Sequence, residues 1–292
     1  MKHIKYLFLI LSTIFIFEMV NPNQAKAADP TPCTITSDVV KKASTGGTDA
    51  IDNGCDTKPD LYEIKIFKLY LCTSLPTEPT TSSTVDLTPC SQIFNSDSGA
   101  TAIVTPGVDV VLDGAYTRPP NGTYTHGYAY MDNTFGITWA GELSAQMTGM
   151  TGGTGVFCGT VAGSGTHAKG STHSNSSVCG ASAITAGKFT ETLAHFGSPT
   201  ATFDPDAVAE DINGTTADIF GYLVDSNEHL AENTGEVDKL EGLVTFADAV
   251  VITADTTSLS MTFNVGEGMH LSEASSKLLI GSGPFQAIMT AN

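Results

Sequence analysis

Six cysteines fall along this chain as three close pairs, and their spacing constrains the fold more than any other feature. They are Cys33, Cys55, Cys72, Cys90, Cys158 and Cys179, and the neighbours in each pair are 22, 18 and 21 residues apart. An even number of cysteines in an exported chain indicates disulfides, and six cysteines allow fifteen connectivities. We expect neighbours to pair, each closing a loop of about 20 residues that contributes roughly 3 kcal/mol. A long-range bridge from Cys90 to Cys158 is the alternative.

The N-terminus has the three parts of a secretory signal. Lys2 and Lys5 precede an apolar run over residues 6–17, and Ala25-Lys26-Ala27 follows as a cleavage pattern. The run is shorter than the roughly 20 apolar residues of a membrane span, so an uncleaved anchor is the less favoured alternative. We therefore predict a signal peptide over residues 1–27 and a secreted protein, located in the periplasm, at the cell surface or outside the cell. No membrane insertion is expected after cleavage.

The chain is strongly acidic, with a formal net charge of −18. Removal of residues 1–27 takes away three lysines and one glutamate, which brings the charge to −20. Nucleic-acid binding needs clustered Lys and Arg, and anionic lipid also repels such a surface. Nucleic acid is therefore excluded as a partner, and cations are better candidates.

Alternating apolar and polar residues predict an all-β fold. Residues 61–72, LYEIKIFKLYLC, alternate with period two, but the apolar parity changes at Phe67, which indicates a bulge or a change of buried face. Residues 259–265, LSMTFNV, alternate without a break. Helix is expected only in short pieces, around residues 206–211 and 228–232. Many short strands with Gly, Asp and Thr turns are typical of a β-sandwich.

Changes in composition divide the chain into two β-rich halves joined by a disulfide-bonded segment. After the signal peptide we expect a tethered N-terminal segment at 28–60, a β-sandwich domain at 61–145, a Gly/Ser/Thr-rich disulfide loop region at 146–187 and a C-terminal β-rich domain at 188–292.

One predicted strand carries a row of aromatic side chains. Tyr124, His126, Tyr128 and Tyr130 alternate after the Pro-Asn-Gly turn and would share one face. Such a row could bind a ligand by stacking sugars. The favoured interpretation is a cross-strand packing ladder, because strands are rich in tyrosine.

Residues 61–140 resemble the Cna-B or prealbumin-like β-sandwich modules of bacterial surface proteins. The resemblance rests on the order of strand, cysteine-bearing loop and strand, followed by Gly122-Thr123-Tyr124 leading into a late strand. The resemblance implies an Ig-like or prealbumin-like sandwich. It implies no site residues, because the Lys/Asn/Glu set that forms isopeptide bonds in some such modules cannot be assigned to positions in this sequence.

Two histidines lie in the segment between Cys158 and Cys179. His167 and His173 are close enough in sequence to reach one ion. Zinc sites use three or four protein ligands, and disulfide-bonded cysteines offer no thiolate. We therefore interpret this segment as a loop held by its disulfide rather than as a metal site.

Calcium is the only cofactor that the sequence suggests. Oxygen ligands concentrate at Asp204, Asp206, Glu210, Asp211 and Asn213. Their spacing is not that of an EF-hand, so a solvated acidic turn is the favoured alternative.

No catalytic motif is recognisable, and no catalytic residue is proposed from the sequence. The leading hypothesis is a non-enzymatic surface or extracellular structural or adhesive protein, with self-assembly, other surface proteins or glycans as its partners. The alternative is a secreted carbohydrate- or ligand-binding module that uses the aromatic strand face. A secreted hydrolase is the third hypothesis.

Overall fold

A computed structural model describes residues 31–42, 50–105, 110–171, 173–197, 200–212 and 215–292. The predicted signal peptide at 1–27 and the predicted calcium ligand Asn213 lie outside these residues. Within the described part the chain is all-β: it contains no α-helix, and the 3-10 turn η1 covers Ile51–Asn53. No helix in these ranges is long and apolar enough to span a membrane.

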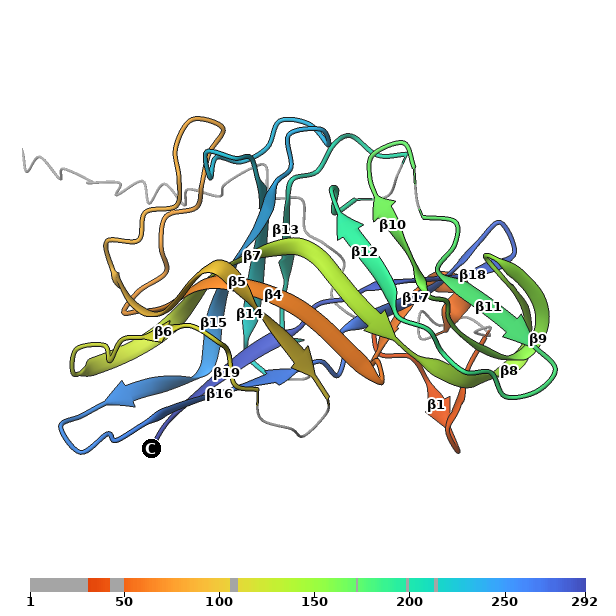
Figure 1. Cartoon of the computed structure of the whole chain (residues 1–292), viewed down its shortest axis with the longest axis horizontal. Helices are drawn as coiled ribbons and strands as arrows, with labels where there is room; N and C mark the ends of the chain where they lie inside the picture. Colours follow the sequence, from red (N-terminus) through yellow and green to blue (C-terminus); the bar gives the residue numbers. More distant parts are fainter. Residues whose placement is uncertain (1–30, 43–49, 106–109, 172, 198–199, 213–214) are drawn as a thin grey trace, which may run out of the picture.

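A nine-stranded sheet forms the larger layer and curves into a half-barrel (Figure 1). Its strands follow the order β13-β14-β15-β7-β4-β5-β6, and β12 and β10 extend it from β7. Their bounds are β4 (Leu61–Cys72), β5 (Cys90–Val104), β6 (Ala115–Tyr116), β7 (Gly122–Thr138), β10 (Gly163–His167), β12 (Phe189–Leu193), β13 (Asp206–Ala209), β14 (Asp218–Val224) and β15 (Lys239–Ile252).

Strand β4 shows how the sequence pattern produces this curvature. Ile64 and Ile66 are buried, and beyond them the buried set is Leu69 and Leu71. The pairing of β4 with both neighbours shifts register between Ile66 and Lys68. A register shift of this kind bends and twists a strand locally. The change of parity predicted at Phe67 therefore lies at a real irregularity in the sheet.

An eight-stranded sheet forms the second layer, in the order β1-β2-β8-β18-β17-β3, with β9 paired to β8 and β11 paired to β9. Its strands are β1 (Ile35–Thr36), β2 (Val39–Val40), β3 (Cys55–Thr57), β8 (Ala140–Gly149), β9 (Gly152–Thr160), β11 (Ser177–Gly180), β17 (Met269–Ala274) and β18 (Lys277–Ser282). A separate two-stranded sheet pairs β16 (Leu259–Asn264) with β19 (Gln286–Ala291).

The main core contains buried side chains from both large sheets. Tyr62, Ile64 and Ile137 come from the nine-stranded sheet, and Leu271 and Ile280 come from the eight-stranded sheet. A second, smaller cluster includes Tyr128, Tyr222, Leu243 and Val85, the last from the loop between β4 and β5.

The predicted disulfide pairing is confirmed. Cys33 bonds to Cys55, Cys72 to Cys90, and Cys158 to Cys179. Two of these bonds join cysteines that stand opposite each other on adjacent strands, β4 with β5 and β9 with β11. Three disulfides and no free cysteine among the described residues indicate an oxidising, extracytoplasmic environment.

Strands from both predicted halves share one sheet. β4 and β7 from residues 61–145 pair with each other, and β7 also pairs with β15 from residues 188–292. The segment predicted as a disulfide loop region, 146–187, forms β9, β10 and β11. The expected helix around 206–211 is wrong, because residues 206–209 form β13 against β14. Residues 228–232 are not helical either.

Replacing the Cys158–Cys179 disulfide tests how much stability it contributes. The double variant Cys158→Ser/Cys179→Ser should unfold with a free energy lower by about 3 kcal/mol, because the bond closes a 21-residue loop in the unfolded chain. Urea denaturation of the oxidised proteins measures the difference. Equal midpoints for the variant and the wild type would contradict the assignment of this bond as a stabilising link.

Candidate functional site

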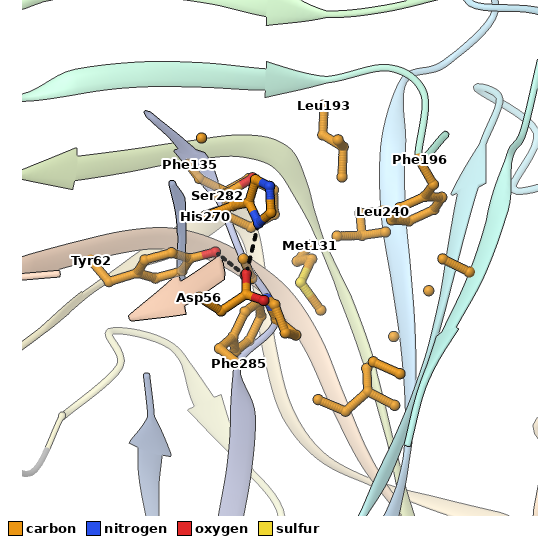
Figure 2. A pocket seen from close by; sticks show the side chains of 18 of the residues that line it. Asp56, Tyr62, Met131, Phe135, Leu193, Phe196, Leu240, His270, Ser282 and Phe285 are labelled. Atoms are coloured by element: carbon orange, nitrogen blue, oxygen red, sulfur yellow. Dashed lines mark hydrogen bonds and ion pairs between the residues drawn. The ribbon is translucent and has the colours of Figure 1, made fainter. Parts of the chain in front are cut away.

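A cavity of about 1120 Å³ is lined by residues of the nine-stranded, the eight-stranded and the two-stranded sheet. Its wall is mainly apolar, and Figure 2 shows these side chains converging on the space from several strands. They include Met131, Phe135, Leu193, Phe196, Leu240, Phe246, Met261, Phe285 and Met289. The apolar wall comes from alternate residues of paired strands, whose side chains face the same side of a sheet.

An aromatic cluster closes one part of this wall. The rings of Tyr62 and Phe135 are 5.7 Å apart between centroids, and Phe285 lies 5.6 Å from Tyr62. The Tyr62 hydroxyl donates to the carbonyl of Gly283 over 3.4 Å. Burial, and then the charge of Glu191, raises the pKa of Tyr62. Tyr62 is therefore a neutral wall residue.

Polar groups also reach the cavity. Nδ1 of His270 lies within hydrogen-bonding distance of Asp56 Oδ1, at 3.0 Å, where β17 pairs with β3 (Figure 2). A second group consists of His167, His173 and Glu191, which also line the cavity. The cavity thus combines a large apolar surface with a few ionisable side chains.

His167, His173 and Glu191 bring one potential ligand atom each to within 4.8 Å of the others. His167 ends β10, and Glu191 lies in β12, which pairs in parallel with β10. His173 lies in the connection between β10 and β11, inside the loop that the Cys158–Cys179 disulfide closes. Among the described residues this is the only group of three or more His, Cys, Asp or Glu side chains that could hold a metal ion.

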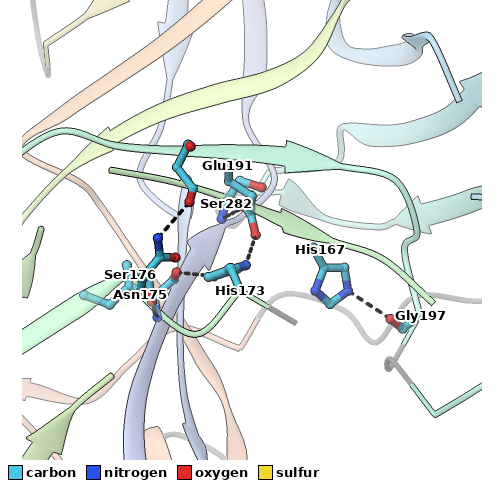
Figure 3. Close-up of polar contacts among 9 residues, drawn as sticks. His167, His173, Asn175, Ser176, Glu191, Gly197 and Ser282 are labelled. Atoms are coloured by element: carbon cyan, nitrogen blue, oxygen red, sulfur yellow. Dashed lines mark hydrogen bonds and ion pairs between the residues drawn. The ribbon is translucent and has the colours of Figure 1, made fainter. Parts of the chain in front are cut away.

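Backbone carbonyls fix the orientation of both imidazoles (Figure 3). The Nε2 atom of His167 is 3.0 Å from the carbonyl of Gly197, and that of His173 is 2.7 Å from the carbonyl of Ile280. A carbonyl only accepts, so each Nε2 carries the proton. In a neutral ring Nδ1 then has a free lone pair. Burial lowers the pKa of His167, which favours that neutral form.

Glu191 is held across the junction between the two large sheets. The backbone N–H of Ser282 in β18 donates to one of its carboxylate oxygens. Its other oxygen, Oε1, lies 3.2 Å from Nδ1 of His173. Both side chains are almost completely buried, with exposed fractions of 4% and 1%. A Cβ at the neighbouring Gly281 would stand 3.1 Å from Oε1, so this glycine leaves room for the carboxylate.

A further histidine lies behind this group. The ring of His195 stacks on that of His167 at 6.0 Å with an interplanar angle of 8°. His195 Nδ1 accepts a hydrogen bond from the backbone N–H of Asp204. His195 thus packs against one wall of the group and ties it to the chain before β13.

The predicted aromatic row on β7 makes mostly internal contacts. Tyr124 is buried in the main core, and its hydroxyl donates to the carbonyl of Pro120 over 2.8 Å. Tyr128 is buried in the second cluster, with its ring 5.5 Å from that of Tyr70. Tyr130 and His126 are half-buried. These are the contacts of a packing ladder, and ligand binding by this row stays a prediction.

The predicted calcium ligands are spread along an extended segment. Asp206 begins β13, whereas Asp211 lies beyond its end with a positive φ of 51°. Burial, with Asp204 and Glu78 nearby, raises the pKa of Asp206 to about 6. Asp204 and Glu210 belong to the same segment, and calcium binding there stays a prediction.

Glu191 is the residue that sequence reasoning missed. Lack of a third ligand was the reason for setting His167 and His173 aside, and Glu191 supplies it from a strand 18 residues beyond His173. No motif spacing links these positions. The only sequence signal was the placement of two histidines inside a loop closed by neighbouring cysteines.

Comparisons with protein-family models, curated proteins and solved structures gave no match to this chain.

A buried carboxylate on β15 predicts a pH-dependent stability. Glu241 is fully buried, and its carboxylate lies beside the hydroxyl of Tyr128. Burial raises its pKa to about 8 from 4.5, although Tyr128 and Lys68 oppose the shift. The folded state therefore holds this proton more tightly than the unfolded chain does. The resulting stabilisation is complete below about pH 4.5 and is lost as the pH rises to about 8.

Removing this carboxylate should flatten the pH profile. Between about pH 5 and pH 8 the wild type should lose about 1.4 kcal/mol of unfolding free energy per pH unit more than Glu241→Gln does. Urea denaturation at several pH values measures both slopes. Glu142→Gln, at an exposed position on β8, is the control and should behave like the wild type. Parallel profiles for Glu241→Gln and wild type would contradict the raised pKa.

Proposed function

We propose that this protein is an exported, non-enzymatic binding protein that holds a small apolar or amphipathic molecule in the cavity between its sheets. The proposal rests on one observation: a space of about 1120 Å³ with a mainly apolar wall and a few polar side chains. Small-molecule sites in proteins are concave, mostly apolar and hold a small number of polar groups that orient the ligand. This differs from the sequence-based alternative, which put the ligand on the aromatic row of β7.

The wall composition suggests the chemistry of the ligand. Phe196, Leu240 and Met261 offer apolar contact, and each Å² of apolar surface removed from water contributes about 25 cal/mol. His270, whose side chain is 42% exposed, offers a hydrogen-bonding partner for a polar head. The ligand we propose is therefore a molecule with a hydrocarbon or aromatic body and one compact polar end.

Export and the finer fold are parts of the same proposal. The signal peptide predicted at 1–27 supports secretion, in agreement with an oxidising environment for the three disulfides. We keep the Ig-like or prealbumin-like sandwich as a proposal for residues 61–140. It is supported by the late strand that begins at Gly122 and by the pairing of β4 with β5 and β7.

A second candidate is the structural or adhesive surface subunit, and one observation favours it. β6 covers β5 only at Phe94 and Asn95, and among the described residues no strand lies beside the rest of that edge. Ile103 on β5 and Tyr116 on β6 are exposed by 53% and 64%. An uncovered strand edge can add a strand from another chain. Self-assembly, surface proteins and glycans remain the proposed partners of this candidate.

Light scattering and electron microscopy of the purified, oxidised chain test the second candidate. If the edge of β5 assembles, the wild type should form ordered particles and Ile103→Lys should reduce them, because a lysine on an exposed edge opposes strand addition. Repeating the measurement with calcium and then with chelator tests the acidic stretch at 204–211. A monomer under all conditions would contradict self-assembly.

Filling the cavity tests the proposed binding function. Ala287 on β19 lines the cavity, whereas its neighbour Ile288 is exposed by 40%. Ala287→Phe should weaken binding of the neutral apolar dye N-phenyl-1-naphthylamine by at least about tenfold, because the ring takes up space that the dye needs. Fluorescence titration measures the affinity, and thermal unfolding checks that the variants fold.

Ile288→Phe is the matched control, since it adds a phenyl group to the same strand on its exposed side. It should bind the dye within about twofold of the wild type. No saturable dye binding by the wild type, or equal loss in both variants, would contradict a binding site in this cavity.

A further inference from the structure

We propose that His167, His173 and Glu191 form a binding site for a divalent transition-metal ion, with zinc as the ion that fits this ligand chemistry. Two imidazoles and one carboxylate are a ligand set that zinc uses when it keeps a coordination position open. The inference goes beyond the proposed binding function and does not depend on it, because it concerns only the geometry of these three side chains.

The first support is convergence. Three side chains from β10, β12 and the loop between β10 and β11 bring their ligand atoms within 4.8 Å of one another. Ligands bound to one zinc at about 2.0–2.2 Å lie roughly 3–4 Å apart, so small side-chain adjustments complete the site. The parallel pairing of Gly165 with Glu191 places His167 and Glu191 on the same face of the sheet.

The second support is the pair of carbonyls behind the histidines. The carbonyl groups of Gly197 and Ile280 accept the Nε2 protons of His167 and His173. Histidines that bind metals through one nitrogen commonly donate the other N–H to a carbonyl or carboxylate, which fixes the tautomer and the ring orientation. In the neutral form of both rings, Nδ1 is therefore the nitrogen that is able to bind an ion.

The third support is an unsatisfied atom. Nδ1 of His173 is buried and has no hydrogen-bond partner, although Glu191 Oε1 lies 3.2 Å away. The two atoms therefore face each other inside the protein, on side chains that are exposed by only 1% and 4%. A buried polar atom without a partner is costly. A cation bound by both atoms would satisfy them together.

The surroundings hold this arrangement in place. Ser176 Oγ accepts the N–H of Ile280 over 3.0 Å, and Asn175 donates to the carbonyl of Ser164 over 2.8 Å, so the loop is tied to β18 and to β10. A Cβ at Gly165 would clash with the Cβ of His173, so only glycine there lets the loop approach β10 this closely. The disulfide between Cys158 and Cys179 closes the same loop.

A metal ion held here would face the cavity. All three residues line it, and three protein ligands leave at least one position of a zinc ion for another donor. If the proposed binding function also holds, that position is where the polar end of a cavity ligand would attach.

Metal titration of the oxidised, untagged chain tests the site after treatment with chelator. Calorimetry with zinc chloride should give one ion per chain with micromolar or tighter affinity. Cobalt(II) should develop the strong visible absorption of a four- or five-coordinate site, which water-rich octahedral binding at the surface does not give. Glu191→Gln and His173→Gln, which keep the side-chain size close, should each weaken zinc binding by at least about tenfold.

His270→Gln is the matched control, because His270 lines the same cavity beside the carboxylate of Asp56 but the pair lacks a third ligand. Its affinity for zinc should equal that of the wild type. The absence of stoichiometric zinc binding and of the cobalt absorption in the wild type would overturn the proposal and leave His173 and Glu191 as a buried pair without an ion. Zinc binding lost in His270→Gln but kept in Glu191→Gln would also overturn it.

These results separate the metal site from the cavity function. Near-ultraviolet circular dichroism shows whether Glu191→Gln and His173→Gln fold. If they do not fold, the presence or absence of the cobalt absorption in the wild type decides whether the metal site exists. Dye binding that is lost in Ala287→Phe while zinc still binds would support both inferences. Zinc binding without any dye binding would support the metal site and contradict the proposed function.

Discussion

The segment from His173 to Ser177 leads from β10 of the nine-stranded sheet into β11 of the eight-stranded sheet, and the arrangement around the cavity depends on its contact with strand β18. The carbonyl of Ile280 accepts from His173, its N–H donates to Ser176, and Ser177 donates to the carbonyl of Leu278. These bonds satisfy backbone groups along β18 that would otherwise be buried without partners. They also bring the eight-stranded sheet against β10 and β12, where Glu191 reaches the N–H of Ser282.

The junction determines where polar groups can stand in an otherwise apolar interior. Phe135 and Phe285 make the wall beside Tyr62 largely hydrocarbon, and a charged group is stable in such surroundings only with a partner. The strand edges at the junction provide such partners, since backbone N–H and C=O groups remain available there. His173 and Glu191 are therefore placed where the two sheets meet, rather than in the middle of the apolar wall.

The two proposals use different parts of the same cavity. Binding of an apolar body depends on space and on side chains such as Met131 and Leu240, whereas metal binding depends on the orientation of two imidazoles by distant carbonyls. Binding of the apolar body needs only a space of suitable size with an apolar wall, so it tolerates changes of side-chain shape. Metal binding is confined to three side chains and requires each of these ligands. An open metal position beside a large apolar space would give the protein a means to select ligands by a single donor atom.

The sequence by itself indicated the all-β class, favoured the disulfide pairing that the structure has and predicted the irregularity in β4. These features are local, because each cysteine pair closes a short loop and the parity of β4 can be followed residue by residue. The helix predicted around residues 206–211 is wrong, because residues 206–209 pair with β14 and form a strand. Tertiary pairing here outweighs the local preference of the sequence. Only the tertiary structure decided the cavity and the meeting of Glu191 with His167 and His173. That meeting depends on the parallel pairing of β10 with β12 and on contact with β18, which is about 100 residues away in the chain and has no signature in local sequence.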